Sequence, residues 1–361
     1  MHIVQLLPEL NQGGVERGTV ELNRALIQRG HTSTVISNGG EQAATITHDG
    51  GHHHTLDICS KNPLTFFQRA RQLRNYLAEI KPDILHARSR VPAWLAWQAN
   101  KKLRLPFITT VHGFNSVNPY SAIMTKGDLV IYGSTAIKEH ILQHYAVDPN
   151  KLRYVPRGID TDFFDPKKAD QPWINAFKTE HQLHQRTVVT TVGRITEWKG
   201  QDDFIRAVAQ VQKTQPAVIG LIVGGVWHGK QEYFASLQQL ARELKADIRF
   251  VGSQPNVREI YALSDIVVSA ASTKPETFGR VAAEALAMNT PVVASAHGGS
   301  LDIIQDGVNG YLFPPSDTTA LAENISTTLS NEAASFRDHI EQHFSLAVNT
   351  EKLLAIYRGV A

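Results

Sequence analysis

"HIVQLLPELNQGGVERGTVELNRALIQRGHTSTVIS", residues 2–37, has the pattern of a buried strand, a helix and a second strand. Its middle part, residues 13–30, carries apolar residues at roughly helical spacing and ends at Gly30, a helix stop signal. The flanking runs, "HIVQLLP" and "HTSTVIS", are short and apolar enough for strands. A strand–helix–strand unit of this kind predicts a parallel sheet that helices cover on both faces.

The same alternation continues in two blocks. The first block predicts further strands at "DILHA", "PFITTVHG" and "DLVIYGS", and the second at "TVVTTVGRI", "AVIGLIVGG", "IRFVG", "IVVSA" and "PVVAS". Residues 155–173 between them are rich in Pro, Asp and Gly, which is typical of a linker. We therefore predict two doubly wound Rossmann-like domains facing across a cleft, residues 1–165 and 166–344, with a helix at about 345–361 that packs back onto the first.

Composition excludes several classes of protein. The chain has 361 residues, 42% hydrophobic and 19% charged, which argues against disorder and favours two domains. A net charge of +2 argues against a nucleic-acid binder on charge alone. Cys59 is the only cysteine, so no internal disulfide can form. Because we find no apolar run of about 18 residues and no secretory signal pattern, we expect a cytoplasmic protein.

The basic residues are unevenly distributed. Residues 61–104 contain ten Lys or Arg and two acids, a local excess of +8. Solvated helix faces would explain this excess. So would a surface for anionic lipid headgroups or a phosphorylated acceptor, and Phe66 and Phe67 within the segment favour that interpretation.

Two loops have the chemistry of phosphate sites. Gly13 and Gly14 lie between a predicted strand and a predicted helix, where a backbone can approach a phosphate or a sugar hydroxyl. Alone, such a pair is often only a turn. "VGRITEWKG" places Arg194 and Lys199 on one loop after a strand, which suits a diphosphate but equally suits a solvated loop.

"PETFGRVAAEALA", residues 275–287, contains two glutamates with seven residues between them. We expect a helix to begin at Phe278 or Gly279, so Glu276 precedes it and Glu284 lies inside it. An ionised carboxylate accepts hydrogen bonds from sugar hydroxyls, and a helix start offers N–H groups to a phosphate. The alternative is a helix-dipole acid and a surface glutamate, which the apolar neighbours of Glu284 make less attractive.

These motifs together resemble the retaining glycosyltransferases of family 4, which have the GT-B fold. The resemblance spans nearly the whole chain and rests on Gly13-Gly14 with Glu16, "VHG", "VPRGID", "GRITEWKG", "PETFGRVAAE" and "GVNGYLFPPSD". It implies that the first domain is the acceptor side and the second the nucleotide-sugar donor side. The sequence departs from the family where Arg157 replaces the asparagine of the usual "NGVD".

The resemblance also implies roles for individual residues. Glu284 would bind the nucleotide ribose, and Glu276 and His112 would lie by the donor sugar and reaction centre. Arg194 and Lys199 would hold the diphosphate, the Gly13-Gly14 loop would close over it, and the helix start at Phe278-Gly279 would help to stabilise the leaving group. The family is thought to let the acceptor attack on the leaving-group face. No metal or other cofactor is expected, because these cations supply the charge.

Three further groups of residues have the chemistry of a possible site. His52, His53 and His54 are consecutive, so they are poor metal ligands. Arg88 and Arg90 follow a predicted strand and are candidates for an anionic acceptor, although a solvated loop fits as well. Trp94 and Trp97 are more typical of a core.

We therefore predict a glycosyltransferase that moves a sugar from a nucleotide-diphosphate donor, commonly a UDP-sugar, to a glycan or lipid-linked acceptor. The resemblance favours lipopolysaccharide or other envelope glycan synthesis, with peripheral contact between the basic segment and the inner face of the cell membrane. The alternatives are a GT-B-fold sugar-nucleotide epimerase, which needs no acceptor, and a non-catalytic two-domain binding protein. The latter leaves the Arg194/Lys199 pair and the two glutamates unexplained.

Overall fold

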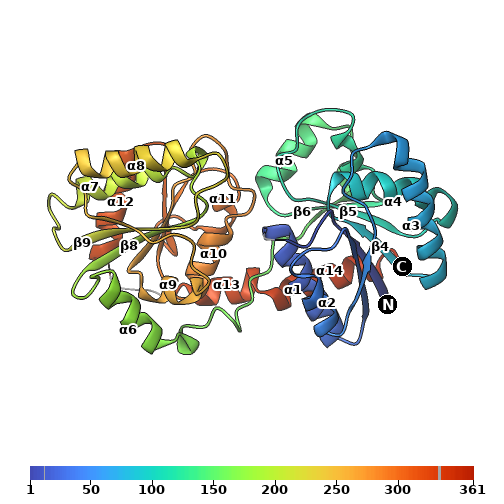
Figure 1. Ribbon diagram of the computed structural model, residues 1–361, viewed down its shortest axis with the longest axis horizontal. Helices are drawn as coiled ribbons and strands as arrows, with labels where there is room; N and C mark the ends of the chain where they lie inside the picture. The colour runs from blue at the N-terminus through green and yellow to red at the C-terminus, as the bar shows by residue number, and fades with distance from the viewer. Residues whose placement is uncertain (12, 332–334) are drawn as a thin grey trace. The chain divides into compact units, whose positions relative to one another are not determined.

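The computed structural model describes residues 1–11, 13–331 and 335–361. It divides the chain into two compact units (Figure 1). Unit 1 consists of Met1–Gly158 and Leu346–Ala361, and unit 2 consists of Ile159–Ser345. We expected the boundary after residue 165, whereas the chain leaves unit 1 after Gly158.

Unit 1 is built on a seven-stranded parallel sheet with the order β3-β2-β1-β4-β5-β6-β7. The chain runs outward from β1 to one edge and then returns to continue from β4, so the order reverses between β1 and β4. The strands are β1 (His2–Leu6), β2 (Thr32–Ser37), β3 (His52–Thr55), β4 (Ile84–Ala87), β5 (Phe107–Val111), β6 (Leu129–Tyr132) and β7 (Leu152–Tyr154). The α-helices are α1 (Gly14–Gln28), α2 (Ala43–His48), α3 (Phe66–Ile80), α4 (Arg90–Leu103), α5 (Thr135–His144) and α14 (Leu346–Arg358). Short 3-10 turns lie at η1 (Pro63–Thr65), η2 (Ser121–Thr125) and η3 (Pro149–Lys151).

Helix α14 is part of the core of unit 1, although it follows unit 2 in the sequence. It packs against α1. Its buried residues Leu353, Leu354 and Tyr357 share one apolar cluster with Ile3 of β1 and Ile108 of β5. The apolar face of α14 thus covers one side of the sheet, which ties residues 346–361 to unit 1.

Unit 2 has a six-stranded parallel sheet with the order β10-β9-β8-β11-β12-β13. Its strands are β8 (Thr187–Val192), β9 (Val218–Val223), β10 (Ile248–Phe250), β11 (Ile266–Ser269), β12 (Val292–Ser295) and β13 (Gly310–Phe313). Its α-helices are α6 (Gln171–Glu180), α7 (Gln201–Val211), α8 (Gln231–Glu243), α9 (Val257–Leu263), α10 (Arg280–Ala287), α11 (Ser300–Ile303), α12 (Thr318–Ser330) and α13 (Arg337–Phe344), with 3-10 turns η4 (Pro166–Lys168) and η5 (Glu197–Lys199). Separate apolar clusters lie on the two faces of this sheet. The predicted fold class, two doubly wound Rossmann-like domains, is confirmed.

The histidine run is a strand. His53 Nε2 lies 2.8 Å from the Ser37 hydroxyl, and the His54 ring stacks on Tyr76 at 3.6 Å. Successive side chains on a strand point to opposite faces, so His52, His53 and His54 cannot converge on one ion. Among the described residues no group of three His, Cys, Asp or Glu side chains is placed to hold a metal.

Two further observations concern the surface. Trp94 packs partly against the core of unit 1, but Trp97 is 36% exposed, so the prediction of a core residue is wrong for Trp97. Its exposed ring is covered by Lys101, whose Nζ lies 4.2 Å from the ring centroid.

No helix in the described part of the chain is long and apolar enough to cross a bilayer.

Candidate active site

The loops that follow three adjacent strands of unit 2 carry the predicted donor-side residues. The strands are β8, β11 and β12, which neighbour one another in the sheet. Arg194 follows β8, Glu276 follows β11, and a glycine pair, Gly298-Gly299, follows β12. Because the carboxyl ends of parallel strands meet at one edge, this is where a doubly wound sheet binds its ligand.

Lys199 and Glu276 form an ion pair between the first two loops. Their side chains are only 18% and 16% exposed. The Lys199 ammonium also lies 4.4 Å from the centroid of the Trp198 ring. Lys199 is therefore held in place from two sides.

Gly200 fixes the position of this loop. Its φ of +66° lies in the left-handed region, and a Cβ there would overlap the carbonyl of Ala270. The glycine lets the backbone just after Lys199 lie directly against the end of β11. It also begins helix α7 as its N-cap.

Helix α10 begins where the sequence predicts. Gly279 is its N-cap, with φ 92°, and Phe278 is buried in the core, so Glu276 lies outside the helix. Glu284, inside the helix, has a side chain that is 6% exposed. Its carboxylate accepts hydrogen bonds from Arg280 Nε at 2.7 Å and from the Tyr261 hydroxyl at 3.0 Å. The carboxylate is thus rigidly oriented by two protein donors.

Sequence reasoning missed two elements of this edge. The Arg194 guanidinium lies 4.2 Å from the centroid of the Trp227 ring, which comes from the loop after β9. The Gly298-Gly299 loop packs on the loop that contains Glu276, since the Gly299 N–H donates to the Glu276 carbonyl at 2.7 Å. The glycine pairs of "GGVWHG" and "HGGS" each follow a strand, as Gly13-Gly14 does, and so could have indicated both loops, although not the contact between Trp227 and Arg194.

In unit 1 the predicted acceptor-side residues line one small cavity of about 280 Å³. Arg88 follows β4, Arg90 begins α4, and His112 follows β5. Glu16 of α1 lines the same cavity and is the only acid among its lining residues. Within the described residues no ion pair joins Glu16 to Arg88 or Arg90.

The two arginines contact neutral groups. Arg88 Nη1 donates to the Gln5 side chain at 2.8 Å, and Arg90 Nη1 donates to the Ser121 hydroxyl at 3.1 Å and the Ser116 hydroxyl at 3.4 Å. Burial lowers the pKa of Arg88 to about 10, so it stays charged at neutral pH. Its Nε is buried with no hydrogen-bond partner among the described residues. The cavity therefore holds positive charge that neighbouring carboxylates do not neutralise directly.

His112 is a neutral side chain at neutral pH. Burial, and then the charges of Arg88 and Arg157, hold its pKa well below the usual value. Its Nε2 is buried and has no partner in the described part of the chain. A neutral imidazole with an unused nitrogen can exchange a hydrogen bond with a ligand hydroxyl.

A second histidine, His86, contacts Thr110, one of the residues that line the cavity. His86 is buried, with Nδ1 2.8 Å from the Tyr357 hydroxyl and Nε2 2.6 Å from the Thr110 hydroxyl. Burial holds its pKa well below the usual value as well. Tyr357 belongs to α14, so the last helix contributes directly to the support of this cavity.

Gly13 and Gly14 begin α1 as predicted, while the preceding Gln12 lies outside the described residues. A Cβ on Gly13 would overlap the Glu16 carboxylate, and one on Gly14 would overlap the Arg157 guanidinium. Arg157, the residue that departs from the family pattern, therefore lies at the start of α1 and within electrostatic reach of His112.

Comparisons with known proteins agree on the class. Residues 12–163 match the family model described as Glycosyltransferase Family 4, and residues 174–344 match the model described as Glycosyl transferases group 1. A glycosyltransferase from Rickettsia africae has the same fold, with a TM-score of 0.91 and 29% identity over 99% of this chain and 98% of that one. HepE from Anabaena, solved in complex with UDP-glucose, aligns with a TM-score of 0.83 at 22% identity over 99% of this chain and all of that one.

Two curated proteins are related to the chain in sequence. The D-inositol 3-phosphate glycosyltransferase of Mycolicibacterium smegmatis is 29% identical over 300 residues, 76% of this chain and 67% of the relative. The chain thus spans about two thirds of that protein's length. Spore coat protein SA of Bacillus subtilis is 25% identical over 96% of this chain and 95% of its own.

The two parallel-sheet units and their structural neighbours define a glycosyltransferase of the GT-B fold. The two family models together match most of the sequence. The chain belongs to glycosyltransferase family 4.

Proposed function

We propose that this protein is a retaining, nucleotide-sugar-dependent transferase that adds a hexose or related sugar to an anionic glycan or lipid-linked acceptor. The observation that carries the donor half is the Lys199–Glu276 ion pair beside Arg194 at the carboxyl edge of unit 2. Two cations near a helix start suit a diphosphate, and HepE, a structural neighbour, was solved with UDP-glucose. We infer a UDP-sugar donor on this basis.

The donor-side groups would act on the leaving group. Negative charge grows on the diphosphate as the glycosidic bond breaks, and fixed cations stabilise that charge without reorganising. Lys199 and Arg194 would supply the cations, and the N–H groups after Phe278-Gly279 would supply further donors. Glu284 would accept hydrogen bonds from the ribose hydroxyls. In this proposal no metal ion takes part.

His112 and Glu276 are assigned to the sugar-transfer step. Neutral His112, with its unused Nε2, can hydrogen-bond a sugar hydroxyl without adding positive charge. Glu276 can accept hydroxyl hydrogen bonds while it pairs with Lys199. The stereochemical outcome, retention, is checked by NMR of the anomeric proton of the first-formed product.

Arg88 and Arg90 are assigned to an anionic group of the acceptor. Among the described residues, no carboxylate pairs directly with their positive charge in the small cavity, so a phosphate or carboxylate ligand would find complementary charge there. Relatives of this chain are named for D-inositol 3-phosphate, a phosphorylated compound. Envelope glycans, including the lipopolysaccharide core, contain acceptors of this chemistry.

We also propose that unit 1 contacts anionic membrane on the cytoplasmic side. Leu64 is 91% exposed and Phe67 is 70% exposed, and Lys61 and Arg71 beside them are exposed too. Basic residues near an anionic leaflet contribute about 1 kcal/mol each. Co-sedimentation with vesicles containing phosphatidylserine, but not with purely zwitterionic ones, is the expected result.

A ligand panel tests the transferase assignment first. One nucleoside diphosphate should raise the melting temperature, since a ligand that binds only the folded state stabilises it by mass action. Mass spectrometry should then detect sugar transfer when a phosphorylated acceptor is added, and chelator should leave the rate unchanged. Conversion of the nucleotide sugar without any acceptor would instead indicate an epimerase. Absence of any nucleotide shift would contradict the proposal.

A further inference from the structure

The interior of a second cavity in unit 1 has no role in the function proposed so far, although Lys61, Phe67 and Arg90 among its lining residues do. Its volume is about 740 Å³, within the range of small-molecule sites. Its walls are largely aromatic and aliphatic, with Phe66, Val91, Trp94 and Tyr120 among the lining residues. The lining includes the cations Lys61, Arg69 and Arg90, and none of the described lining residues is an acid. An apolar site with positive charge suits a ligand that is apolar and anionic.

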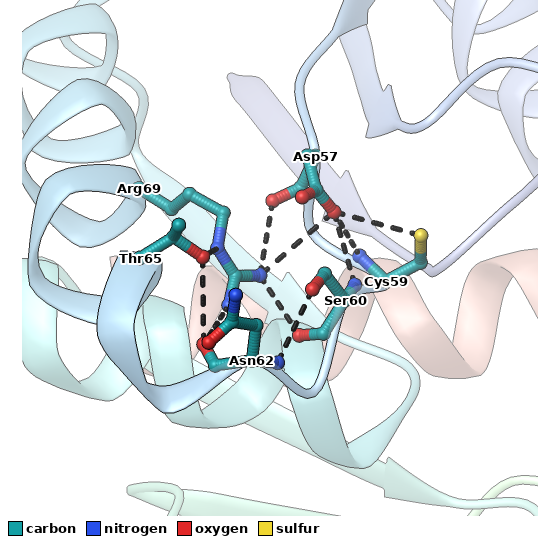
Figure 2. A network of polar contacts seen from close by, with 6 residues as sticks. All are labelled: Asp57, Cys59, Ser60, Asn62, Thr65 and Arg69. Atoms are coloured by element: carbon teal, nitrogen blue, oxygen red, sulfur yellow. Dashed lines mark hydrogen bonds and ion pairs between the residues drawn. The ribbon is translucent and has the colours of Figure 1, made fainter.

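One wall of this cavity is held by a buried arginine. The Arg69 side chain is 5% exposed and lies under the loop before α3 (Figure 2). It donates to the carbonyls of Ser60 at 2.9 Å and Asn62 at 3.0 Å and to the Thr65 hydroxyl at 3.1 Å. The same network includes Asp57, whose carboxylate accepts from the Ser60 N–H at 3.0 Å. This wall cannot collapse into the cavity without breaking several buried hydrogen bonds.

The opposite wall is also fixed. Trp94 Nε1 donates to the Tyr120 carbonyl at 2.9 Å, which attaches the loop after β5 to helix α4. The Arg90 guanidinium lies 5.5 Å from the centroid of the Tyr120 ring. The cavity is thus a built feature with two hydrogen-bonded walls.

Arg90 connects this cavity to the smaller one. It lines both, and on the other side it accompanies Arg88 and His112. An anionic group at Arg90 would therefore leave the rest of the same molecule next to the apolar walls. At the rim, the exposed side chain of Phe67 extends the apolar surface outward.

We propose that the larger cavity binds the hydrocarbon portion of an amphiphilic acceptor whose phosphate or carboxylate lies at Arg90. The proposal rests on the transferase function above and specifies its acceptor as an alkyl or polyprenyl amphiphile. Arg90 anchors the head, and Phe66, Val91 and Trp94 remove the chain from water. The reaction attaches the sugar to a hydroxyl of the head group, with the nucleoside diphosphate as leaving group and the hydroxyl proton passing to the departing phosphate.

Alkyl phosphates of increasing chain length test the cavity directly. Titration calorimetry with inorganic phosphate, hexyl phosphate and decyl phosphate, below their micelle concentrations, should show each added methylene tightening binding about three- to fourfold until the cavity is filled. Val91→Trp, which places an indole ring in the cavity, should end this chain-length dependence at a shorter alkyl chain. Arg90→Gln should retain the dependence and lose the preference for decyl phosphate over decyl glucoside.

A surface variant and a matched control separate a loss of ligand binding from misfolding. Phe67→Ser changes an exposed rim residue and should weaken decyl phosphate binding several-fold without altering the melting temperature. Val308→Ser in unit 2 is the matched control, since Val308 is also exposed, at 66%. It should leave both properties unchanged.

The outcomes separate this inference from the function on which it rests. If UDP raises the melting temperature and transfer occurs, but affinity does not rise with alkyl length, the acceptor is not bound here and the inference fails alone. Binding of glucose 6-phosphate as tightly as decyl phosphate would identify a glycan site and also overturn it. If no nucleotide binds at all, the transferase function fails first, whatever the alkyl series shows.

Discussion

The two units hold their positive charge in different ways. In unit 2, Lys199 pairs with Glu276, and Arg194 lies on an aromatic ring. In unit 1, the described contacts of Arg88 and Arg90 are with neutral oxygens and a tyrosine ring, and the histidine beside them is kept neutral. Unit 2 thus has an internally compensated site, whereas we propose that a ligand completes the charge of the site in unit 1. Removing one partner of a compensated ion pair lowers the stability of that site. In an uncompensated site, ligand affinity depends on the salt concentration and on the charge of the ligand.

Removing a cation from unit 2 should have the largest effect. Lys199→Ala removes the proposed leaving-group contact and leaves Glu276 as a poorly exposed carboxylate without its ion pair. We expect kcat/KM to fall on the order of 100-fold to 1000-fold, the usual loss for an electrostatic contact to developing charge. Lys230→Ala is the control, because it breaks the more exposed ion pair with Glu197 in the same unit. Equal losses in both variants would contradict the assignment of Lys199.

Glu284 needs a conservative change. Glu284→Ala would remove the ion pair with Arg280, whose side chain is only 15% exposed, a change that costs up to about 3–5 kcal/mol in stability and obscures ligand effects. Glu284→Gln preserves the shape and removes the charge, and we expect UDP to bind about tenfold or more weakly, as for a lost charged hydrogen bond. Calorimetry measures this, with Glu243→Gln on α8 as control. Unchanged UDP affinity would remove the ribose assignment.

Acid should destabilise unit 1. Burial favours the neutral forms of His86 and His112, so the unfolded chain binds more protons than the folded one as the pH falls below about 6.5. Each group then lowers the free energy of unfolding by up to about 1.4 kcal/mol per pH unit until its folded-state pKa is reached. Hydrogen exchange at pH 7.5 and 5.5, compared peptide by peptide, should show greater loss of protection in β4 and β5 than in β8. His112→Asn should reduce that loss.

The smallest expected effect compares two glycines. Gly30 in unit 1 and Gly200 in unit 2 have similar φ values, +74° and +66°, but only Gly200 would bring a Cβ into a backbone carbonyl. Both alanine variants are destabilised by the left-handed backbone conformation. The difference between their free energies of unfolding therefore measures the contact with Ala270. We expect Gly200→Ala to be less stable by about 1–2 kcal/mol, within the usual range for overpacking, in denaturant unfolding. Equal stabilities would mean that the loop simply shifts.

The sequence alone predicted those helices and strands that have a clear local pattern. The strand–helix alternation specified two parallel-sheet units, and the helix start at Gly279 followed from its position before an alanine-rich run. The strand at His52–Thr55 was not predicted, because polar histidines at a sheet edge lack the usual apolar signal. The fold also brought Trp227 to Arg194 from a different loop, and no spacing in the sequence indicates that contact.

The basic segment, residues 61–104, shows more clearly what the sequence alone cannot predict. Arg69 belongs to the ten basic residues of 61–104, yet it is buried and organises a loop instead of facing a lipid. A guanidinium that satisfies backbone carbonyls looks the same in sequence as one on a solvated face. The large apolar cavity depends on that arginine, and so it could not be inferred from composition.

The return of the last helix to unit 1 has a consequence for synthesis on the ribosome. Unit 2 has all its residues once Ser345 has left the exit tunnel, whereas unit 1 still lacks Leu353, Leu354 and Tyr357. The half of the molecule that is translated first therefore finishes folding last. Until α14 is available, the sheet of unit 1 exposes an apolar face and His86 lacks its contact with Tyr357. Chaperones that capture nascent chains should therefore bind mainly to the N-terminal strands.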